Sequence, residues 1–495
     1  MLNKRIKDKW LLVPIVILLV YFIYRLIDQS NLLSYFPMDY TNDISSYMAQ
    51  LHFLKECGFL NYCPYWYNGF TSFNFTPPGW FFFALPFYYF FGDVKIATYI
   101  TMILSFLLAF SVIFIAGKYF GFSKVQRIAF FVFLFATAFS VGSFVRLGRV
   151  HELFAWVWFL IFAFLVLYYK DKELDLFSLL IIPSYALIVL SYLSTGVLAS
   201  LLFLGLFLVK GKREKFKIIT YFLVSLLLIA FWLVPFAKGV FTSSSIPSLD
   251  QNSWLWQFRA EHIFTNIAIF LLPIMFLLLF YFYWKSKNKS RKELLFFIPI
   301  IILAIIYFFR LTPFIPIFRN IFPDPYLPFL LFFTLFLFFK IDYSKFNEKI
   351  YKIIPILLVV LSIISISINI IHTPKFVVPD DDANKQLQPL LSKFSGSFMI
   401  FGDLPRTIYP KALYSFAPIY YNLSTPYGWY PEVKEPSYFG IFDKLNPNDC
   451  TEFSKDLTYL NTTHIIGYKN ICSRFNECSF SFLENSGDFC LYETT

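Results

Sequence analysis

Long apolar runs recur along most of the chain and are separated by short polar turns. Each run has about 17–22 residues, the length that an α-helix needs to cross the hydrocarbon core of a bilayer. The pattern predicts an α-helical polytopic membrane protein with about eleven transmembrane helices. The expected spans lie near residues 10–27, 94–116, 128–145, 152–169, 176–193, 195–209, 217–236, 263–284, 294–310, 326–341 and 351–371.

Two apolar segments need a separate interpretation. The run at 11–27 follows several Lys and Arg residues, as in a signal peptide, but no small-residue cleavage site comes after it. We therefore expect it to be a retained span. The apolar segment 80–91 contains Pro86 and is too short to span, so we expect an interfacial or re-entrant piece.

Two longer polar segments lie between and after the spans. Residues 28–79 form a first outer loop, and residues 372–495 form a tail that is long enough for a core of its own. Apolar and polar positions alternate in the tail at 397–401 and 463–468, which predicts strands. We expect two domains: a transmembrane domain at 1–371 and a C-terminal extracytoplasmic domain, α/β or mainly β, at 372–495.

Composition and charge support a membrane location. The chain is 58% hydrophobic and only 15% charged, against about 45–50% and about 25% in soluble domains. Its net charge of +11 comes from Lys and Arg in every second short loop, as at 210–217 and 285–292. This is the positive-inside pattern of a multi-pass cell-membrane protein with a cytoplasmic N-terminus and an outer C-terminus. It argues for membrane lipids and against nucleic acid as partners.

The cysteines fall only in the two segments that we place outside. An even number in each segment favours disulfides there. Zinc is the alternative, but Cys472 and Cys478 are too far apart for a Cys-x-x-Cys knuckle. The first loop allows one local pairing, whereas the tail allows three. The six cysteines are Cys57, Cys63, Cys450, Cys472, Cys478 and Cys490.

Polar side chains also gather near the outer ends of the spans. Charged side chains near the hydrocarbon boundary cost free energy unless they form ion pairs or serve a function. Their convergence on one face predicts a single cavity that opens outward. The candidates are Asp39, Asp43 and His52; Arg146, Arg149, His151 and Glu152; Arg259, Glu261 and His262; and Arg310, Arg319, Asp324 and Tyr326.

Asp39 and Asp43 are the candidates for catalysis. A carboxylate can accept the proton of an attacking hydroxyl, and two together can hold a divalent cation such as Mg²⁺ or Mn²⁺. In a helix, their spacing of four would place both on one face. The structural alternative is a helix N-terminus, where Asp is favoured.

The basic candidates have two interpretations as well. Arg146 and Arg149 suit phosphate binding, or they are snorkelling charges with Glu152 as ion-pair partner. A structural role is the stronger expectation for His262. The Pro-rich segment 310–326 cannot form a straight helix, so we expect it to line a cavity or lie at the interface. The chain has no Gly-rich phosphate loop, so the substrate should arrive already activated.

The order of these features resembles the GT-C superfamily of integral membrane glycosyltransferases. The resemblance rests on an inner N-terminus, one span, and an outer loop that opens with Asp39 and ends at Pro77-Pro78-Gly79. Other pieces are similar to the prokaryotic membrane proteins related to 6-pyruvoyl-tetrahydropterin synthase. These are Gly148-Arg149-Val-His151-Glu152, Phe231-Trp232-Leu-Val-Pro235, the Arg319 segment and the 460–467 strand.

The resemblance implies an inverting transferase that moves a sugar from a polyprenyl-phosphate donor to a glycan, lipid or protein acceptor on the outer face. Asp39 matches the family's acidic residue that acts as base or metal-associated carboxylate, and Asp43 matches a second acidic position. Arg149, Arg259 and Arg319 are the candidates for the lipid phosphate. The two acids are separated by three residues instead of the usual one. Two alternatives are a transporter or flippase of lipid-linked saccharides and a non-catalytic relative in an envelope complex.

Overall fold

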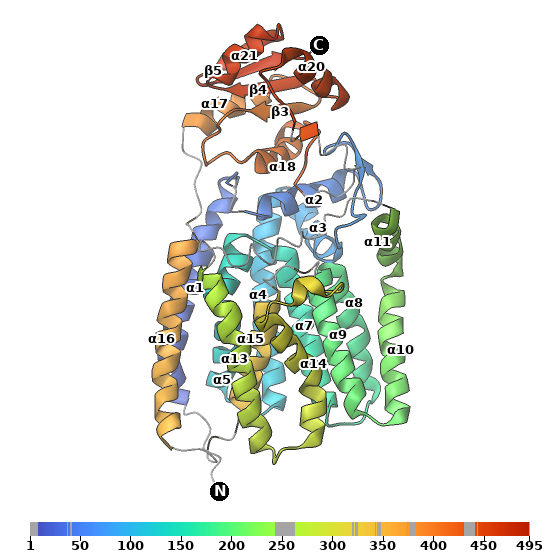
Figure 1. Ribbon diagram of the computed structural model, residues 1–495, viewed down its shortest axis with the longest axis vertical. Coiled ribbons are helices and arrows are strands. Elements are labelled where there is room, and N and C mark those ends of the chain that lie inside the picture. The colour runs from blue at the N-terminus through green and yellow to red at the C-terminus, as the bar shows by residue number, and fades with distance from the viewer. Residues whose placement is uncertain are drawn as a thin grey trace. The chain divides into compact units, whose positions relative to one another are not determined.

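The computed structural model describes residues 8–36, 38–39, 42–242, 263–318, 321, 325–341, 343, 348–373, 375, 382–429, 441–442 and 444–494. The chain is mostly helical, with a small β-sheet in its C-terminal part (Figure 1). It divides into two compact units. We call residues 1–28, 102–231 and 247–375 the helical unit, and residues 29–101, 232–246 and 376–495 the loop–tail unit.

The helical unit is built from apolar helices. Helix α7 is central to it, because it packs against both α8 and α9 and is buried along most of its length (Figure 1). Its sequence is apolar on all sides, as expected for a helix surrounded by protein. Its helices are α1 (Asp8–Gln29), α4 (Val94–Tyr119), α5 (Lys124–Phe135), α6 (Ala138–Ser140), η2 (Val141–Arg146), α7 (Val150–Tyr169), η3 (Leu176–Leu180), α8 (Ile181–Ser191), α9 (Leu193–Val209), α10 (Lys212–Leu228), α13 (Ile263–Ser286), α14 (Arg291–Phe308), η5 (Thr312–Phe314), α15 (Tyr326–Lys340) and α16 (Glu348–His372). Helix α11 (Ala230–Thr242) and the first turns of α4 are assigned to the loop–tail unit.

Each expected span coincides with a helix or with a pair of helices. Among the described residues, four helices are long and apolar enough to cross a membrane, or six if each of two bent pairs counts as one span. Several others, such as α9 and α15, are apolar but shorter. These helices fit a membrane protein, and the total of eleven spans stays a prediction.

Two expected straight spans are broken. The chain bends by 54° between α5 and α6 and by 77° between α10 and α11. At the first break Thr137 has an extended backbone, which a helix cannot continue. The freed backbone groups find side-chain partners: Ser365 Oγ accepts from the Ala138 N–H at 2.8 Å, and Ser140 Oγ donates to the Leu134 carbonyl. Such partners make a break tolerable at membrane depth.

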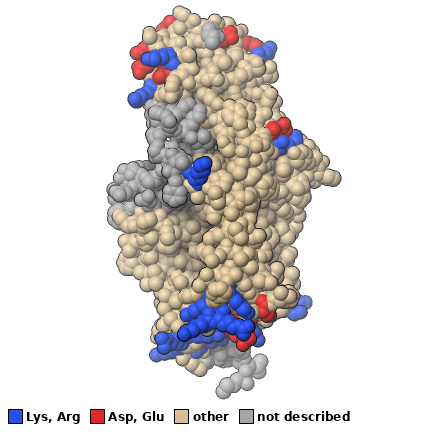
Figure 2. All heavy atoms as spheres, turned by 90° about the vertical axis from the view of Figure 1, so that its right-hand side faces the viewer, with Lys and Arg blue, Asp and Glu red and all other residues tan. Residues whose placement is uncertain are grey.

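Basic turns meet at one end of the helical unit, where Figure 2 shows Lys and Arg gathered. Lys170, after α7, forms a 2.5 Å ion pair with Glu293 in the first turn of α14. Lys292 pairs with Asp171 at 3.2 Å, which joins the same two turns. The alternation of basic loops in the sequence therefore corresponds to a real clustering in space.

The loop–tail unit contains a four-stranded sheet in the order β3-β4-β6-β5. Strands β3 and β4 are parallel, and the other neighbours are antiparallel. The strands expected at 397–401 and 463–468 are β3 and β4, which confirms an α/β arrangement. The elements are η1 (Ser30–Leu33), α2 (Ile44–Glu56), β1 (Tyr62–Cys63), β2 (Phe70–Thr71), α3 (Gly79–Phe91), α17 (Asp382–Leu391), β3 (Phe398–Phe401), α18 (Pro410–Tyr421), α20 (Cys450–Tyr459), β4 (His464–Tyr468), α21 (Ile471–Glu477), β5 (Ser481–Ser486) and β6 (Phe489–Glu493).

The first outer loop and the tail pack together within this unit. Helix α2 of the loop packs against α18 of the tail. Trp66, fully buried, donates from Nε1 to the Tyr414 carbonyl at 3.0 Å. Asn68 Nδ2 donates to the Leu460 carbonyl at 2.7 Å. Residues more than 300 positions apart thus share one core.

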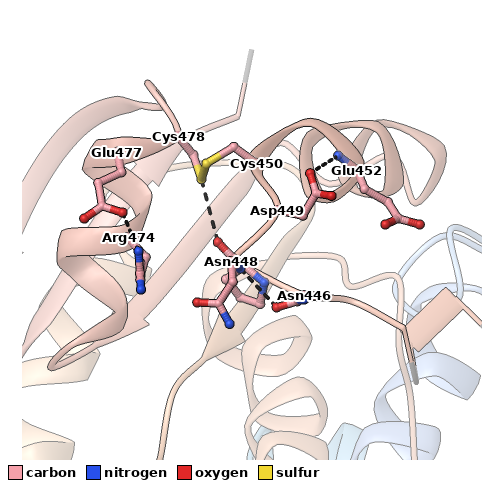
Figure 3. Close-up of a disulfide and its surroundings, with 9 residues drawn as sticks. Asn446, Asn448, Asp449, Cys450, Glu452, Arg474, Glu477 and Cys478 are labelled. Carbon is pink, nitrogen blue, oxygen red and sulfur yellow. Dashed lines mark hydrogen bonds and ion pairs between the residues drawn. A yellow bond between two sulfur atoms is a disulfide. The ribbon is translucent and has the colours of Figure 1, made fainter.

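All six cysteines form disulfides, as expected. Cys57 pairs with Cys63 in the first loop. In the tail, Cys450 pairs with Cys478 and Cys472 pairs with Cys490. Figure 3 shows how the Cys450–Cys478 bond connects the start of α20 to the end of α21. These bonds staple a small domain that has a limited core.

Candidate active site

Asp39 lies in a bend before α2 and is only 5% exposed. Asn42 Nδ2 donates a hydrogen bond to Asp39 Oδ1 at 2.8 Å, and Asn42 itself is fully buried. The preceding residue is fixed as well, because the carbonyl of Met38 accepts from the Tyr409 N–H at 2.8 Å. The tail therefore helps to hold the backbone beside the candidate base.

Asp43 occupies the position immediately before α2. Its carbonyl accepts from the Ser46 N–H at 3.1 Å and from Ser46 Oγ at 2.7 Å, but its carboxylate makes no capping hydrogen bond. The helix begins at Ile44, so Asp39 and Asp43 do not share a helix face. The loop conformation at Asp39 overrides the spacing argument. The structural alternative correctly predicted that Asp43 lies at a helix N-terminus. Its side chain, however, does not cap the helix.

The tail contributes two polar side chains with shifted pKa values that the sequence did not single out, and one of them, Tyr409, lies near Asp43. Burial raises the pKa of Tyr409, and the negative charge of Asp43 raises it further. Burial also lowers the pKa of Lys411, which lies over the Tyr427 ring at 5.4 Å. No motif or spacing marks either residue. Only the pairing of Tyr409 with Met38 brings this part of the tail to the first loop.

His52 lies in the core of the loop–tail unit. Its Nδ1 is 3.0 Å from the hydroxyl of Tyr88, and burial lowers its pKa to about 4. It follows Asp43 by nine residues along α2, which corresponds to about 13 Å of helix rise. His52 is therefore neutral near pH 7 and remote from Asp43. This position favours a structural role over substrate binding.

The second group of candidates belongs to the helical unit. After the π-helical turn η2, Gly148 has a φ of +67°, a left-handed conformation that suits glycine. The turn places Arg149 just before α7 and Glu152 in its first turn. Arg149 Nη1 is 3.9 Å from Glu152 Oε2, and Glu152 is 1% exposed. A π-helical turn of this kind is frequent at functional sites.

Glu152 also lines a small, mostly apolar cavity within the helical unit. Helix η2 and the neighbouring α6 supply one wall, and the start of α15 supplies another. The lining residues are Phe139, Ser140, Ser143, Phe144, Glu152, Leu327 and Pro328. A carboxylate and two hydroxyls in such surroundings could orient a polar group of a ligand.

The other described candidates contact protein groups. Arg146 Nη2 donates to the Lys375 carbonyl at 3.2 Å, beyond the end of α16. His151 packs edge-on against Tyr192, with ring centroids 4.9 Å apart. Arg310 is 2% exposed and lies over the Phe270 ring at 4.7 Å. Their roles in substrate binding stay predictions.

Five candidates lie outside the described residues, namely Arg259, Glu261, His262, Arg319 and Asp324. The segment that contains Arg319 is only partly described, with η5 as its one assigned helix in the described part. No group of three His, Cys, Asp or Glu side chains that could hold a metal occurs among the described residues. A metal at Asp39 and Asp43 therefore stays a prediction.

The fold has counterparts among solved structures. No protein-family model and no curated protein sequence matches the chain. It is similar to ArnT from Cupriavidus metallidurans bound to undecaprenyl phosphate, with a TM-score of 0.53 and 12% identity over 98% of each chain. It is also similar to the oligosaccharyltransferase AglB from Archaeoglobus fulgidus, solved with an inhibitory peptide and a dolichol-phosphate. That match has a TM-score of 0.55 and 11% identity over 91% of this chain and 69% of AglB.

A third similar structure is the arabinofuranosyltransferase AftD from Mycobacteria. The TM-score is 0.57 at 10% identity, and the match covers 99% of this chain but only 40% of AftD. A further structure of the Archaeoglobus enzyme was solved with Zn and sulfate. At identities this low, the comparisons establish the fold. The chain has the fold of the GT-C glycosyltransferases.

Proposed function

We propose that this protein is a GT-C glycosyltransferase that moves a sugar from a polyprenyl-phosphate donor to an acceptor on the outer face of the cell membrane. The observation that carries the proposal is the fold, which matches ArnT over nearly the whole of both chains. The buried carboxylate of Asp39 at the start of the first loop adds a candidate base in a protein poor in charge. We keep the relation to the 6-pyruvoyl-tetrahydropterin synthase-related subgroup as the finer assignment.

The proposed chemistry is a single inverting displacement. The oxygen of the acceptor hydroxyl attacks the anomeric carbon of the sugar, and the carboxylate of Asp39 accepts the proton of that hydroxyl. The bond from that carbon to the phosphate oxygen breaks, and the polyprenyl phosphate leaves with the bonding electrons. In the helical unit, Arg149 stays a candidate for binding the lipid phosphate, since a guanidinium makes two-pronged contacts with phosphate oxygens.

A divalent cation is a further part of the proposal. Asp39 and Asp43 would hold it, because Mg²⁺ is commonly bound by one or two carboxylates and completed by substrate phosphates. One Asp39 oxygen accepts a hydrogen bond from Asn42, which holds that carboxylate in a fixed orientation. When bound, the cation would neutralise charge on the donor phosphate.

The disulfides support an outer location of the first loop and the tail. Disulfides persist in oxidising compartments and are rare in the cytosol. Three of them lie in the loop–tail unit. The basic turns of the helical unit would then face the cytoplasm, in accordance with the positive-inside rule.

The decisive experiment measures sugar transfer from a labelled polyprenyl-phosphate donor by the full-length protein in membranes. Asp39→Asn should lower turnover by about 10²–10⁴-fold, the usual contribution of a general base. Asp93→Asn is the matched control: Asp93 lies in the same unit, and Oδ1 of its side chain accepts from the Lys95 N–H at the start of α4, a role that asparagine keeps. Unchanged turnover in Asp39→Asn would exclude Asp39 as the base. Movement of the donor across the membrane without sugar transfer would favour a flippase.

A further inference from the structure

Three turns of the helical unit form one basic surface. We define the basic rim as residues 170–175, 210–217 and 285–293, the turns that follow α7, α9 and α13. These segments contain twelve Lys and Arg residues and five Asp and Glu residues, so their net charge is +7. The largest group of blue side chains in Figure 2 lies at this end of the helical unit.

Ion pairs and hydrogen bonds hold the three turns against one another. The turn after α7 is joined to the turn after α13 by the Lys170–Glu293 and Lys292–Asp171 pairs described above. It is joined to the start of α10 by Lys217 Nζ, which donates to the Leu174 carbonyl at 2.9 Å, and by Glu214, which accepts from the Leu174 N–H at 2.9 Å. The rim is therefore a fixed platform, and its charges keep their spacing.

The internal ion pairs use only part of the positive charge. Lys170 is buried and occupied by Glu293, and Lys210 is paired with Glu214 at 3.1 Å. The rim also carries six exposed bases that form no ion pair with another described residue. These are Lys172, Lys212, Arg213, Lys285, Lys289 and Arg291. The rim thus presents an excess of outward positive charge.

Large apolar side chains lie directly beside these charges. Leu176 and Phe177 on η3 are 80% and 72% exposed, and Phe216 on α10 is 73% exposed. Helix η3 is held to α10 through Ser178 and Tyr221, whose hydroxyl oxygens are 2.8 Å apart. Exposed apolar groups next to exposed lysines are the arrangement of segments that lie in the membrane interface.

We propose that the basic rim is a binding surface for the headgroups of anionic phospholipids. The exposed bases contact the lipid phosphates, while Leu176, Phe177 and Phe216 enter the adjoining acyl region. Positive-inside topology alone requires basic loops but neither a shared platform nor apolar side chains beside it. The proposal concerns lipid binding and does not depend on glycosyl transfer.

The test compares retention of phosphatidylglycerol and phosphatidylcholine by the purified full-length protein in mixed detergent micelles, measured by native mass spectrometry. The protein should retain phosphatidylglycerol in preference. Lys212→Gln/Arg213→Gln and Lys289→Gln/Arg291→Gln should each weaken that retention by roughly tenfold or more, since a base near an anionic surface contributes about 1 kcal/mol. Lys444→Gln/Lys455→Gln, two exposed lysines of the tail, is the matched control and should behave like the wild type.

A salt titration of the unmodified protein provides a second measurement that does not depend on any variant. Exposed charges are screened within about 3 Å at 1 M salt, so the preference for phosphatidylglycerol should disappear there. Equal retention of the two lipids, a preference that survives high salt, or an equal loss in the tail control would each overturn the proposal.

Discussion

Asn42 Nδ2 donates a 2.8 Å hydrogen bond to Oδ1 of Asp39, and both side chains are buried. The bond fixes the orientation of the carboxylate that we propose as the base. Asn42 is thus a positioning residue for Asp39, provided that the protein transfers sugars.

The first prediction concerns this bond. Asn42→Ala should lower the rate of sugar transfer by roughly tenfold to a hundredfold, because a hydrogen bond to a charged group contributes about 1.5–3 kcal/mol. The loss should appear in kcat, with KM nearly unchanged, because the bond orients the carboxylate for proton transfer. Asn384→Ala, at a buried asparagine on α17 in the same unit, is the control. Equal losses in Asn42→Ala and Asn384→Ala would show that Asn42 serves only the fold.

The second prediction concerns acid stability. Burial lowers the pKa of His52 to about 4, whereas an unfolded histidine titrates near 6.5. Between these values the unfolded chain binds the proton and the folded chain does not, so the free energy of unfolding falls as the pH falls from about 6.5 to about 4. The loss should reach about 3 kcal/mol. Unfolding curves of the wild type and His52→Gln, measured across this window, should diverge; parallel curves would contradict the assignment.

The third prediction compares two disulfides. The Cys450–Cys478 bond closes a loop of 28 residues and the Cys57–Cys63 bond a loop of six. Chain entropy predicts a stabilisation of about 3.5 kcal/mol for the longer loop and about 2 kcal/mol for the shorter one. Paired Cys→Ser variants should lower the unfolding temperature of the loop–tail unit in that order. The reverse order would show that native-state contacts outweigh loop entropy here.

The fourth prediction concerns the buried ion pair of the basic rim. Lys170 and Glu293 are 5% and 10% exposed at the side chain, with 2.5 Å between Nζ and Oε1. Lys170→Met leaves the buried carboxylate without its main partner and should cost about 3–5 kcal/mol of stability. Lys170→Met/Glu293→Met should recover much of that loss, because no buried charge is left. A double-mutant cycle of unfolding free energies tests this, and simple additivity of the two single variants would contradict it.

Much of the architecture could be predicted from local patterns. Apolar runs mark the longer helices of the helical unit, because burial in lipid or protein leaves few other residues acceptable there. Alternation of apolar and polar residues marks β3 and β4, because successive side chains of a strand point to opposite faces of the sheet. Because an even number of cysteines lies in each outer segment, all six are expected to pair, but the four in the tail allow three connectivities. Only the positions of α20, α21 and β6 decide among them.

The candidate site could be predicted only in part. Asp39 is conspicuous in the sequence because an acid at the edge of an apolar span is expensive. The surroundings of Asp39 are not conspicuous, since Asn42 has no distinctive spacing. Tyr409, which holds the neighbouring Met38 backbone, is far away in the sequence. The same limit applies to the basic rim. The positive charge of each loop can be read from the sequence, but the contact that joins two of these loops, between Lys170 and Glu293, links residues 123 positions apart. Segment length and periodicity determine which helices and strands form, because the free-energy cost of exposing or burying the wrong side chain depends on neighbouring residues in the sequence. Which side chains meet is decided by packing between distant segments, and for this protein that includes the surroundings of the proposed base.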